Sequence, residues 1–306
     1  MGYSVRAGTR STYSSLLRFY HRFCTQCGLD PGVPITEERL CCAAINFCSL
    51  RSCRGLDSYF SAIGWWHKAA GYGALPLHGV TYYRVKRGLI NIFGQFDRET
   101  PAPAISLDQL ATMLPFIDLE TFDGARGWCA LLFAFFGLLR IREYTGDKMA
   151  LRVEHVRAEA GGIVLTVPWS KADAHPAEVR LVARHDRMCP VLAFSVFSGF
   201  FRHPRPPRQP FFPSAPSSSA AVCPATFTSW WRKIGSAAGI DMAEVTGHSL
   251  RRGGTTEMFN AGVAETVIKA HGRWRSESFR RYFSSPSSSF LATQSLFSHT
   301  RARYPL

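Results

Sequence analysis

The chain has 306 residues, of which 46% are hydrophobic, and this content supports sizeable buried cores and excludes a largely disordered protein. Lys and Arg number 36 against 22 Asp and Glu, a net charge of +14 that favours a polyanion as partner, nucleic acid being the commonest, over a plain enzyme with a basic surface. The longest apolar run, CALLFAFFGLL at 129–139, is too short to span a membrane, and the N-terminus lacks the apolar core of a secretory signal.

Four helices are predicted in the first hundred residues. Apolar side chains recur there at helical spacing over 11–27, over a stretch that Thr36 can cap, over about 55–70 and over about 79–94. The last of these helices carries Arg84, Lys86 and Arg87. We interpret this basic helix as a DNA contact, although the same charges also suit a solvated face.

Cysteines concentrate in this first region. Cys24 and Cys27 form a C-x-x-C pair, and Cys41, Cys42 and His21 follow or precede it closely, so a structural zinc site is one interpretation. The second pair is adjacent rather than spaced, however, and the cysteines fall on apolar helical positions. Buried small hydrophobic residues are therefore the preferred interpretation. Nine cysteines, an odd number, also favour reduced thiols inside a cell.

A linker is predicted at DRETPAPA, residues 97–104, because two prolines follow a charged run. The expected domains are therefore 1–97 and 105–306, with 98–104 as the linker. Ser106 and Gln109 form a capping-box pattern at the start of the next helix. The pattern beyond it predicts a mainly α domain with a small antiparallel β-sheet: helices at 106–116 and 124–139, strands at 150–155, 162–168 and 178–183, and helices at 187–201, 225–238, 248–261, 263–271 and 276–283.

Three motifs in the second domain combine basic residues with one tyrosine. FFGLLRIRE at 135–143 places Arg140 just beyond a buried helix, and GHSLRRGG places His248 and Arg251 three residues apart, on one side of a helix start. IKAHGRWRSESFRRYF then ends close to Tyr282. Each residue alone also suits an ordinary role, such as a helix-end arginine or a capping histidine.

In this order and spacing, the motifs resemble the tyrosine recombinase (integrase) family over essentially the whole chain. HSLRRGG, KAHGRWRSESFRRYF and YFSAIGWWHKAAG look most like the recombinases of Crypton and DIRS transposons. The resemblance implies a helical, SAM-like core-binding domain at 1–97 and a recombinase catalytic domain at 105–306, which together clamp duplex DNA. It further implies a homo-tetramer on DNA, no metal or other cofactor, no membrane and no small-molecule substrate. We expect an intracellular, DNA-associated protein, nuclear if the host is a eukaryote.

The chemistry of such a site explains why these residue types are needed. A tyrosine can attack a phosphodiester and hold the DNA end as a 3′-phosphotyrosine ester, which conserves the bond energy without ATP. Two guanidiniums stabilise the added negative charge on phosphorus, a role that fits Arg140 and Arg251. Lys171, in the turn between the last two strands, would protonate the leaving 5′ oxygen, and His248 would support proton handling.

The resemblance also assigns supporting residues. The position nine before Tyr282 is Arg273, which we expect to face the phosphate, with His271 as the alternative and Trp274 beside them. Glu143 would orient Arg140. Arg252 is expected to face solvent, a carboxylate or the DNA backbone.

Two other functions stay open from the sequence. A type IB topoisomerase uses a similar residue set to relax supercoils, and a non-catalytic DNA-binding protein can descend from a transposon recombinase.

The Ser-rich tail contributes an apolar patch, Phe290, Leu291 and Leu296, which is a candidate for docking on a neighbouring subunit.

Overall fold

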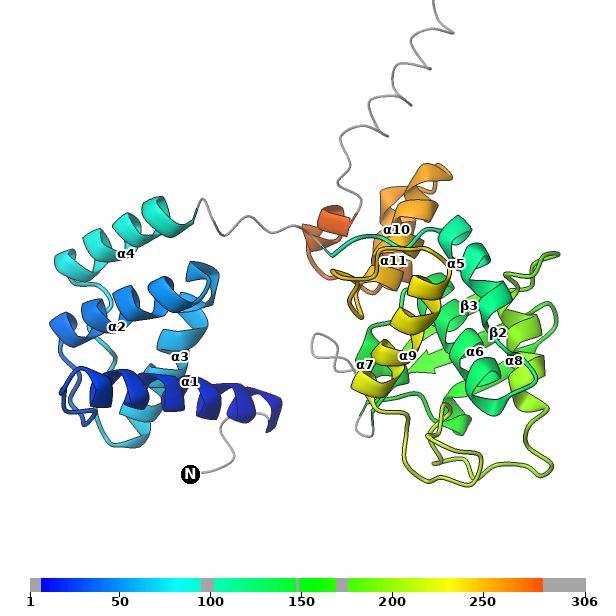
Figure 1. Ribbon diagram of the computed structural model, residues 1–306, viewed down its shortest axis with the longest axis horizontal. Coiled ribbons are helices and arrows are strands. Elements are labelled where there is room, and N and C mark those ends of the chain that lie inside the picture. The colour runs from blue at the N-terminus through cyan, green and yellow to red at the C-terminus, as the bar shows by residue number, and fades with distance from the viewer. Residues whose placement is uncertain (1–6, 95–101, 147–148, 169–175, 283–306) are drawn as a thin grey trace, which may run out of the picture. The chain divides into compact units, whose positions relative to one another are not determined.

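The computed structural model describes residues 7–94, 102–146, 149–168 and 176–282. The chain divides into two compact units, Met1–Thr100 and Pro101–Leu306, which are described separately below (Figure 1). The predicted fold class, mainly α with one small antiparallel sheet, is confirmed. No helix in the described part of the chain is long and apolar enough to cross a membrane.

The N-terminal unit contains four α-helices and one short 3₁₀ helix: α1 (Ala7–Gln26), α2 (Glu37–Leu50), η1 (Cys53–Gly55), α3 (Leu56–Ala69) and α4 (Val80–Phe93). Helix α1 packs on α3, and α2 packs on α4. Their shared core is rich in aromatic residues, and the rings of Phe47 and Tyr59 stack with centroids 4.6 Å apart. The predicted cap of α2 is confirmed, because the Thr36 side chain accepts a hydrogen bond from the amide of Arg39.

Polar side chains join segments of this unit that are far apart in sequence. The buried His67 accepts a hydrogen bond from the Ile35 amide at Nε2 (3.2 Å), and its Nδ1 lies 2.9 Å from the carbonyl oxygen of Gly73. The carboxylate of Glu37, at the start of α2, accepts from the Tyr82 amide (2.8 Å) in the first turn of α4. Helix ends that are far apart in sequence are thereby held together.

The cysteine interpretation holds only in part. Cys24 and Cys41 are buried, as are Cys48 and Cys53, but Cys27 and Cys42 are exposed, so they are not buried hydrophobic residues. Cys27 lies in the turn just beyond the end of α1, and Cys42 points away from its neighbour Cys41 because adjacent residues of a helix are about 100° apart around its axis. Within the described ranges, no group of three His, Cys, Asp or Glu side chains is arranged to hold a metal ion.

The C-terminal unit is built around α6, which is buried along most of its length. Helices α8 and α10 pack against it, and the predicted Ser106–Gln109 capping box is present at α5. The elements are α5 (Leu107–Met113), η2 (Leu114–Phe116), α6 (Phe122–Phe136), α7 (Ile141–Tyr144), η3 (Val153–His155), β1 (Val156–Glu159), β2 (Gly162–Val167), β3 (Ala177–Val182), α8 (Pro190–Ser198), α9 (Pro224–Ala237), α10 (Ser249–Asn260), α11 (Glu265–His271) and η4 (Glu277–Tyr282).

The three strands form an antiparallel sheet in the order β1-β2-β3. The prediction of the first strand at 150–155 is wrong, because β1 begins only at Val156. The backbone before it forms other hydrogen bonds instead: the Leu151 amide donates to the backbone carbonyl oxygen of Glu143 on α7, and the Val153 amide donates to that of Gln209. Lys171, predicted in the turn between β2 and β3, lies outside the described residues, as does the tail patch of Phe290, Leu291 and Leu296.

Candidate active site

Arg140 and Glu143 stand at the start of α7, directly after the buried helix α6. Helix α6 ends at Phe136, and Leu138 then takes a left-handed backbone conformation (φ 46°) that turns the chain away from the helix axis. The buried Glu143 carboxylate accepts from the Arg140 amide (2.8 Å) and from its Nη1 (2.8 Å). The position of Arg140 is therefore fixed at both its backbone and its side chain.

Arg251 lies on the first turn of α10, and its side chain is fully buried. Its Nη1 donates to the carbonyl oxygen of Leu138 (2.5 Å) and its Nη2 to that of Gly272, while its Nε is buried without a hydrogen-bond partner. His248 is the residue before α10 begins, and it lies close enough to Arg251 and Arg140 for their charges to affect its titration.

Two glycines allow α10 to approach its neighbours so closely. A Cβ atom at Gly253 would lie 1.8 Å from the carbonyl oxygen of Ile105, and one at Gly254 would lie 2.2 Å from that of Phe135. Both obstacles are backbone atoms, so the space cannot be made by turning a side chain. The GG of GHSLRRGG is thus a packing requirement that places Arg251 against the end of α6.

The stretch after α11 brings Arg273 to the same cluster. Its backbone is left-handed (φ 60°), and its Nη2 donates to the Glu143 carboxylate (2.7 Å) and to the Leu138 carbonyl oxygen (3.2 Å). The ring Nε2 of His271 lies 2.7 Å from the Phe136 carbonyl oxygen. In this structure both residues predicted for the last phosphate contact are therefore held by acceptors of the protein itself.

Tyr282 is the last described residue, and Trp274 packs directly against it. The two ring centroids are 5.2 Å apart, and the Arg251 guanidinium carbon is 6.0 Å from the tyrosine ring. The hydroxyl of Thr256 on α10 donates to the backbone carbonyl of Tyr282 (3.2 Å). Of the predicted set, the structure gathers Arg140, His248, Arg251, Arg273 and Tyr282, together with Glu143, Trp274 and His271.

The cluster carries a surplus of positive charge. The three guanidiniums of Arg140, Arg251 and Arg273 gather around the carboxylate of Glu143, so these four described side chains together carry a net charge of +2. Burial, followed by the charges of Arg140 and Arg273, lowers the pKa of Arg251 to about 9. Because an arginine stays protonated in proteins, the lowered pKa expresses the free-energy cost of gathering this charge, which a bound anion would offset.

The two histidines of the cluster are neutral at neutral pH for the same reasons. Burial lowers the pKa of His248, and the charges of Arg251 and Arg140 lower it further. Burial is also the main cause that lowers the pKa of His271. A neutral imidazole is able to accept a proton.

The remaining predicted DNA contacts lie elsewhere. On α4, Arg84 and Arg87 are exposed, whereas the Lys86 ammonium pairs with the Asp57 carboxylate (2.6 Å). Arg252, next to Arg251 on α10, is half-buried. Lys86 is thus already engaged by the protein, which distinguishes it from the two arginines.

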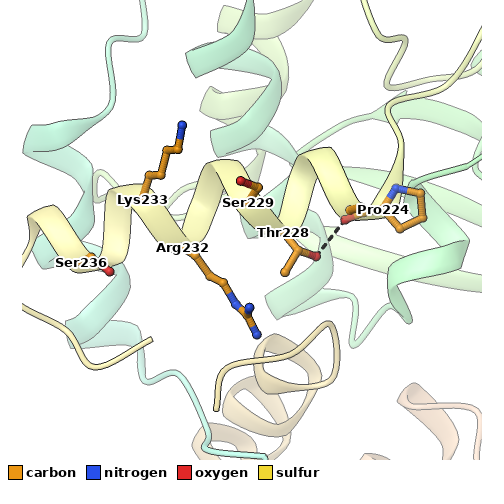
Figure 2. Close-up of a pocket in the computed structure, with 7 residues that line it drawn as sticks. Pro224, Thr228, Ser229, Arg232, Lys233 and Ser236 are labelled. Atoms are coloured by element: carbon orange, nitrogen blue, oxygen red, sulfur yellow. Dashed lines mark hydrogen bonds between the residues drawn. The ribbon is translucent and has the colours of Figure 1, made fainter. Parts of the chain in front are cut away.

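The sequence interpretation missed the polar face of α9. Thr228, Ser229, Arg232 and Lys233 line an open pocket along this helix, and Figure 2 shows Arg232 and Lys233 leaving the helix in different directions. The Nε of Arg232 donates to the Val245 carbonyl oxygen (3.1 Å), which ties α9 to the loop that precedes α10. The sequence signal that could have indicated this face is the recurrence of hydroxyl and basic residues every three or four positions, which places them on one side of a helix.

The comparisons with known proteins bear on the fold. No protein-family model matches the sequence, and no curated protein matches it. The solved structure of the XerH site-specific recombinase bound to a palindromic difH substrate is similar, with a TM-score of 0.65 and 14% identity over 94% of this chain and 79% of that one. The Tn1549 transposon integrase in complex with circular intermediate DNA has a TM-score of 0.60 and 11% identity, over 95% of each chain. A lambda integrase dimer bound to a core site has a TM-score of 0.59 and 11% identity, over 93% and 91%.

These similarities show that the chain has the fold of the tyrosine recombinases. The finer resemblance to Crypton and DIRS recombinases stays a prediction, since those structures belong to other recombinases.

Proposed function

We propose that this chain is a tyrosine recombinase that cuts and rejoins strands of duplex DNA through a covalent 3′-phosphotyrosine intermediate, without metal or ATP. The observation that carries the proposal is the cluster itself: Tyr282 lies beside the buried Arg251, within a described group of three arginines and one glutamate. The fold shared with DNA-bound recombinases supports the same function.

The reaction follows from the charges and proton acceptors of the site. A phosphodiester carries one negative charge, and its pentacovalent transition state carries a second on the non-bridging oxygens. A cluster with a net charge of +2 among Arg140, Arg251, Arg273 and Glu143 therefore stabilises the transition state more than the ground state, with Arg140 and Arg251 as the proposed phosphate ligands. The buried Nε of Arg251, which lacks a partner, is a further donor for this oxygen pair.

The bonds and protons balance in one displacement. The Tyr282 oxygen forms a bond to phosphorus while the bond from phosphorus to the 5′ oxygen breaks. Neutral His248 takes the phenolic proton, and Lys171 gives a proton to the leaving 5′ oxygen. Attack by a 5′ hydroxyl on the phosphotyrosine reverses these steps and rejoins a strand.

For the whole chain, we propose that the domains expected from the sequence have the following roles. Residues 1–97 would be the core-binding domain, with Arg84 and Arg87 on its DNA side, 98–104 the linker and 105–306 the catalytic domain. The partner would be duplex DNA, bound by a homo-tetramer because exchange between two duplexes needs four active sites. We propose a transposon origin of Crypton or DIRS type and a DNA-associated location inside the cell.

The test is to trap the covalent intermediate. A binding site is first selected from a random duplex library, and a nicked version of it is then incubated with the protein so that the cleaved strand cannot be rejoined. The wild type should form a protein–DNA adduct, Tyr282→Phe should form none, and the exposed Tyr83→Phe should match the wild type.

The other outcomes identify the competing functions. Adduct formation by Tyr282→Phe would contradict the assigned nucleophile. Binding without any adduct from the wild type would indicate a non-catalytic DNA-binding protein. Adducts at unrelated sequences together with relaxation of supercoiled DNA would indicate a type IB topoisomerase.

A further inference from the structure

The proposed phosphate ligand Arg251 cannot be reached by DNA in this structure. Its side chain has no exposed surface, although two of its nitrogens donate to the carbonyl oxygens of Leu138 and Gly272. Its Nε is buried and has no partner, a state that costs about 1–3 kcal/mol for an ordinary polar group. A phosphate that is to take this donor must first gain access to it, so some part of the surrounding cluster has to move.

Among the described residues, Trp274 lies over the Arg251 guanidinium. The Arg251 guanidinium carbon lies 4.1 Å from the centroid of the Trp274 ring, the stacked geometry of a cation–π contact. The same ring touches Tyr282 and lies 6.1 Å from Phe279. The indole belongs to the stretch after α11 and not to α10, and this stretch contacts Arg251 through the Gly272 carbonyl oxygen.

The backbone beside Trp274 is strained. Among the described residues, Leu138 and Arg273 are the two non-glycine residues with positive φ, and both belong to this cluster. The Leu138 carbonyl oxygen accepts from Arg251 and from Arg273. Left-handed backbone in residues with side chains persists where surrounding contacts hold it, and it often marks a site that switches. Arg273 directly precedes Trp274, so a change of its backbone angles would move the indole.

We propose that Trp274 is a movable cover, a positioning residue that keeps Arg251 inaccessible while no DNA is bound. When the indole swings away together with the Gly272 carbonyl, which accepts from Nη2, the Nε and Nη2 edge of Arg251 becomes available to the two phosphate oxygens. Tyr282 moves with it, because its ring packs against Trp274. The role of the uncovered Arg251 rests on the proposed function, but the cover itself can be measured without any DNA.

Gly272 provides a sharp way to displace the cover. A Cβ atom on Gly272 would lie 1.6 Å from the Trp274 ring, so alanine there cannot coexist with the observed indole position. The backbone of Gly272 has ordinary angles (φ −78°, ψ −3°), which alanine adopts freely. Gly272→Ala therefore acts on the side chain of Trp274 and not on the backbone.

The experiment measures the reactivity of single arginines in the DNA-free full chain. Phenylglyoxal, which labels accessible guanidiniums, is applied for increasing times and each arginine is quantified by mass spectrometry of peptides. In the wild type, Arg251 should react slowly, like the buried Arg126, and Arg280 should react fast. Gly272→Ala and Trp274→Ala should each raise the Arg251 rate about tenfold, because labelling follows the population of the open state.

Controls separate a cover from general loosening of the fold. Gly88→Ala, where an added Cβ meets nothing, should leave the Arg251 rate unchanged. The proposal is overturned if wild-type Arg251 reacts as fast as Arg280, or if Trp274→Ala leaves Arg251 protected. It is also overturned if Arg126 loses protection together with Arg251, because Trp274 would then maintain the fold. Failure of the adduct assay alone would count against the proposed function and not against the cover.

Discussion

Glu143 balances the charge of the arginine cluster. Its carboxylate contacts Arg140 twice and Arg273 once, and it is almost completely buried. These contacts explain how three guanidiniums can share so small a volume. They also make the stability of the C-terminal unit depend on a single negative charge.

We expect Glu143→Gln to lower the free energy of unfolding by about 3–5 kcal/mol, because buried arginines lose their counter-charge while the side-chain volume stays the same. Denaturant unfolding of the full chain measures this loss. The exposed Glu277, paired with Lys269, offers a control, and Glu277→Gln should change stability little because solvent screens such pairs. Equal effects of the two substitutions would contradict the assigned role of Glu143.

His248 should make stability depend on pH. Its folded pKa lies below the ordinary value of 6.5, so below that pH the unfolded chain binds more protons than the folded one. Stability therefore falls as the pH drops from about 6.5 through the folded pKa, and is constant above that window. His248→Gln should flatten this decline in urea unfolding between pH 7.5 and pH 5, with His271 retaining part of it.

His203, which is exposed on the loop after α8, provides the comparison, and His203→Gln should keep the wild-type pH dependence. An unchanged decline in His248→Gln would mean that the positive charges of Arg251 and Arg140 do not act on the His248 ring.

Single residues differ in how far the sequence could predict them. Arg140, His248, Arg251 and Tyr282 belong to spaced motifs, and the structure brings them into one cluster. The direction of Arg273 could not be predicted, because it depends on a left-handed backbone that no neighbouring residue type indicates. The sequence could not predict the stacking of Trp274 on Arg251 either, since this contact joins residues from separate elements.

At the scale of elements, helix α10 depends on its two glycines. We expect Gly253→Ala to lower the free energy of unfolding by about 1–3 kcal/mol or more, because the added methyl group meets the backbone of Ile105. Gly88→Ala on α4 makes the same chemical change in open space, and should raise stability by about 0.5–1 kcal/mol. Thermal or denaturant unfolding should thus show opposite signs, and a stabilised Gly253→Ala would contradict the close contact.

Elements with clear periodicity were predicted well, and those without it were not. The helices of the N-terminal unit and the capping box at Ser106 follow local rules, and the structure has them. The first strand was misplaced because β1 is largely exposed and lacks apolar alternation, whereas the apolar residues before it pack against the loop around Phe211. The helix predicted at 276–283 is a 3₁₀ stretch, Glu277–Tyr282.

At the scale of the whole molecule, positive charge is spread over both units. Residues 1–100 contain twelve Lys and Arg against six Asp and Glu, a net charge of +6, and the remaining residues contribute +8. If both units contact the same duplex, the affinity for DNA should fall steeply with salt, because each neutralised phosphate releases counterions.

Replacing both Arg84 and Arg87 with Ala should weaken DNA binding and reduce the slope of log K against log salt by about 1.8, or about 0.9 for each phosphate that is no longer neutralised. Lys86→Ala should change the slope less, because its ammonium already pairs with Asp57. Binding titrations on a selected duplex at several salt concentrations give these slopes. An equal decrease for all three residues would mean that the Asp57 pair opens on binding.

The hydrogen bond from Thr256 to the backbone of Tyr282 has a mechanical consequence. Thr256 lies a little more than one helical turn beyond Arg251, so one helix, α10, carries the proposed phosphate ligand and anchors the backbone of Tyr282, the proposed nucleophile. If α10 moved as a rigid body, Arg251 and the backbone of Tyr282 would move together, and the distance between them would stay the same. Errors in alignment between attacking oxygen and phosphorus would then arise mainly in the tyrosine side chain, which has two rotatable torsions before the ring.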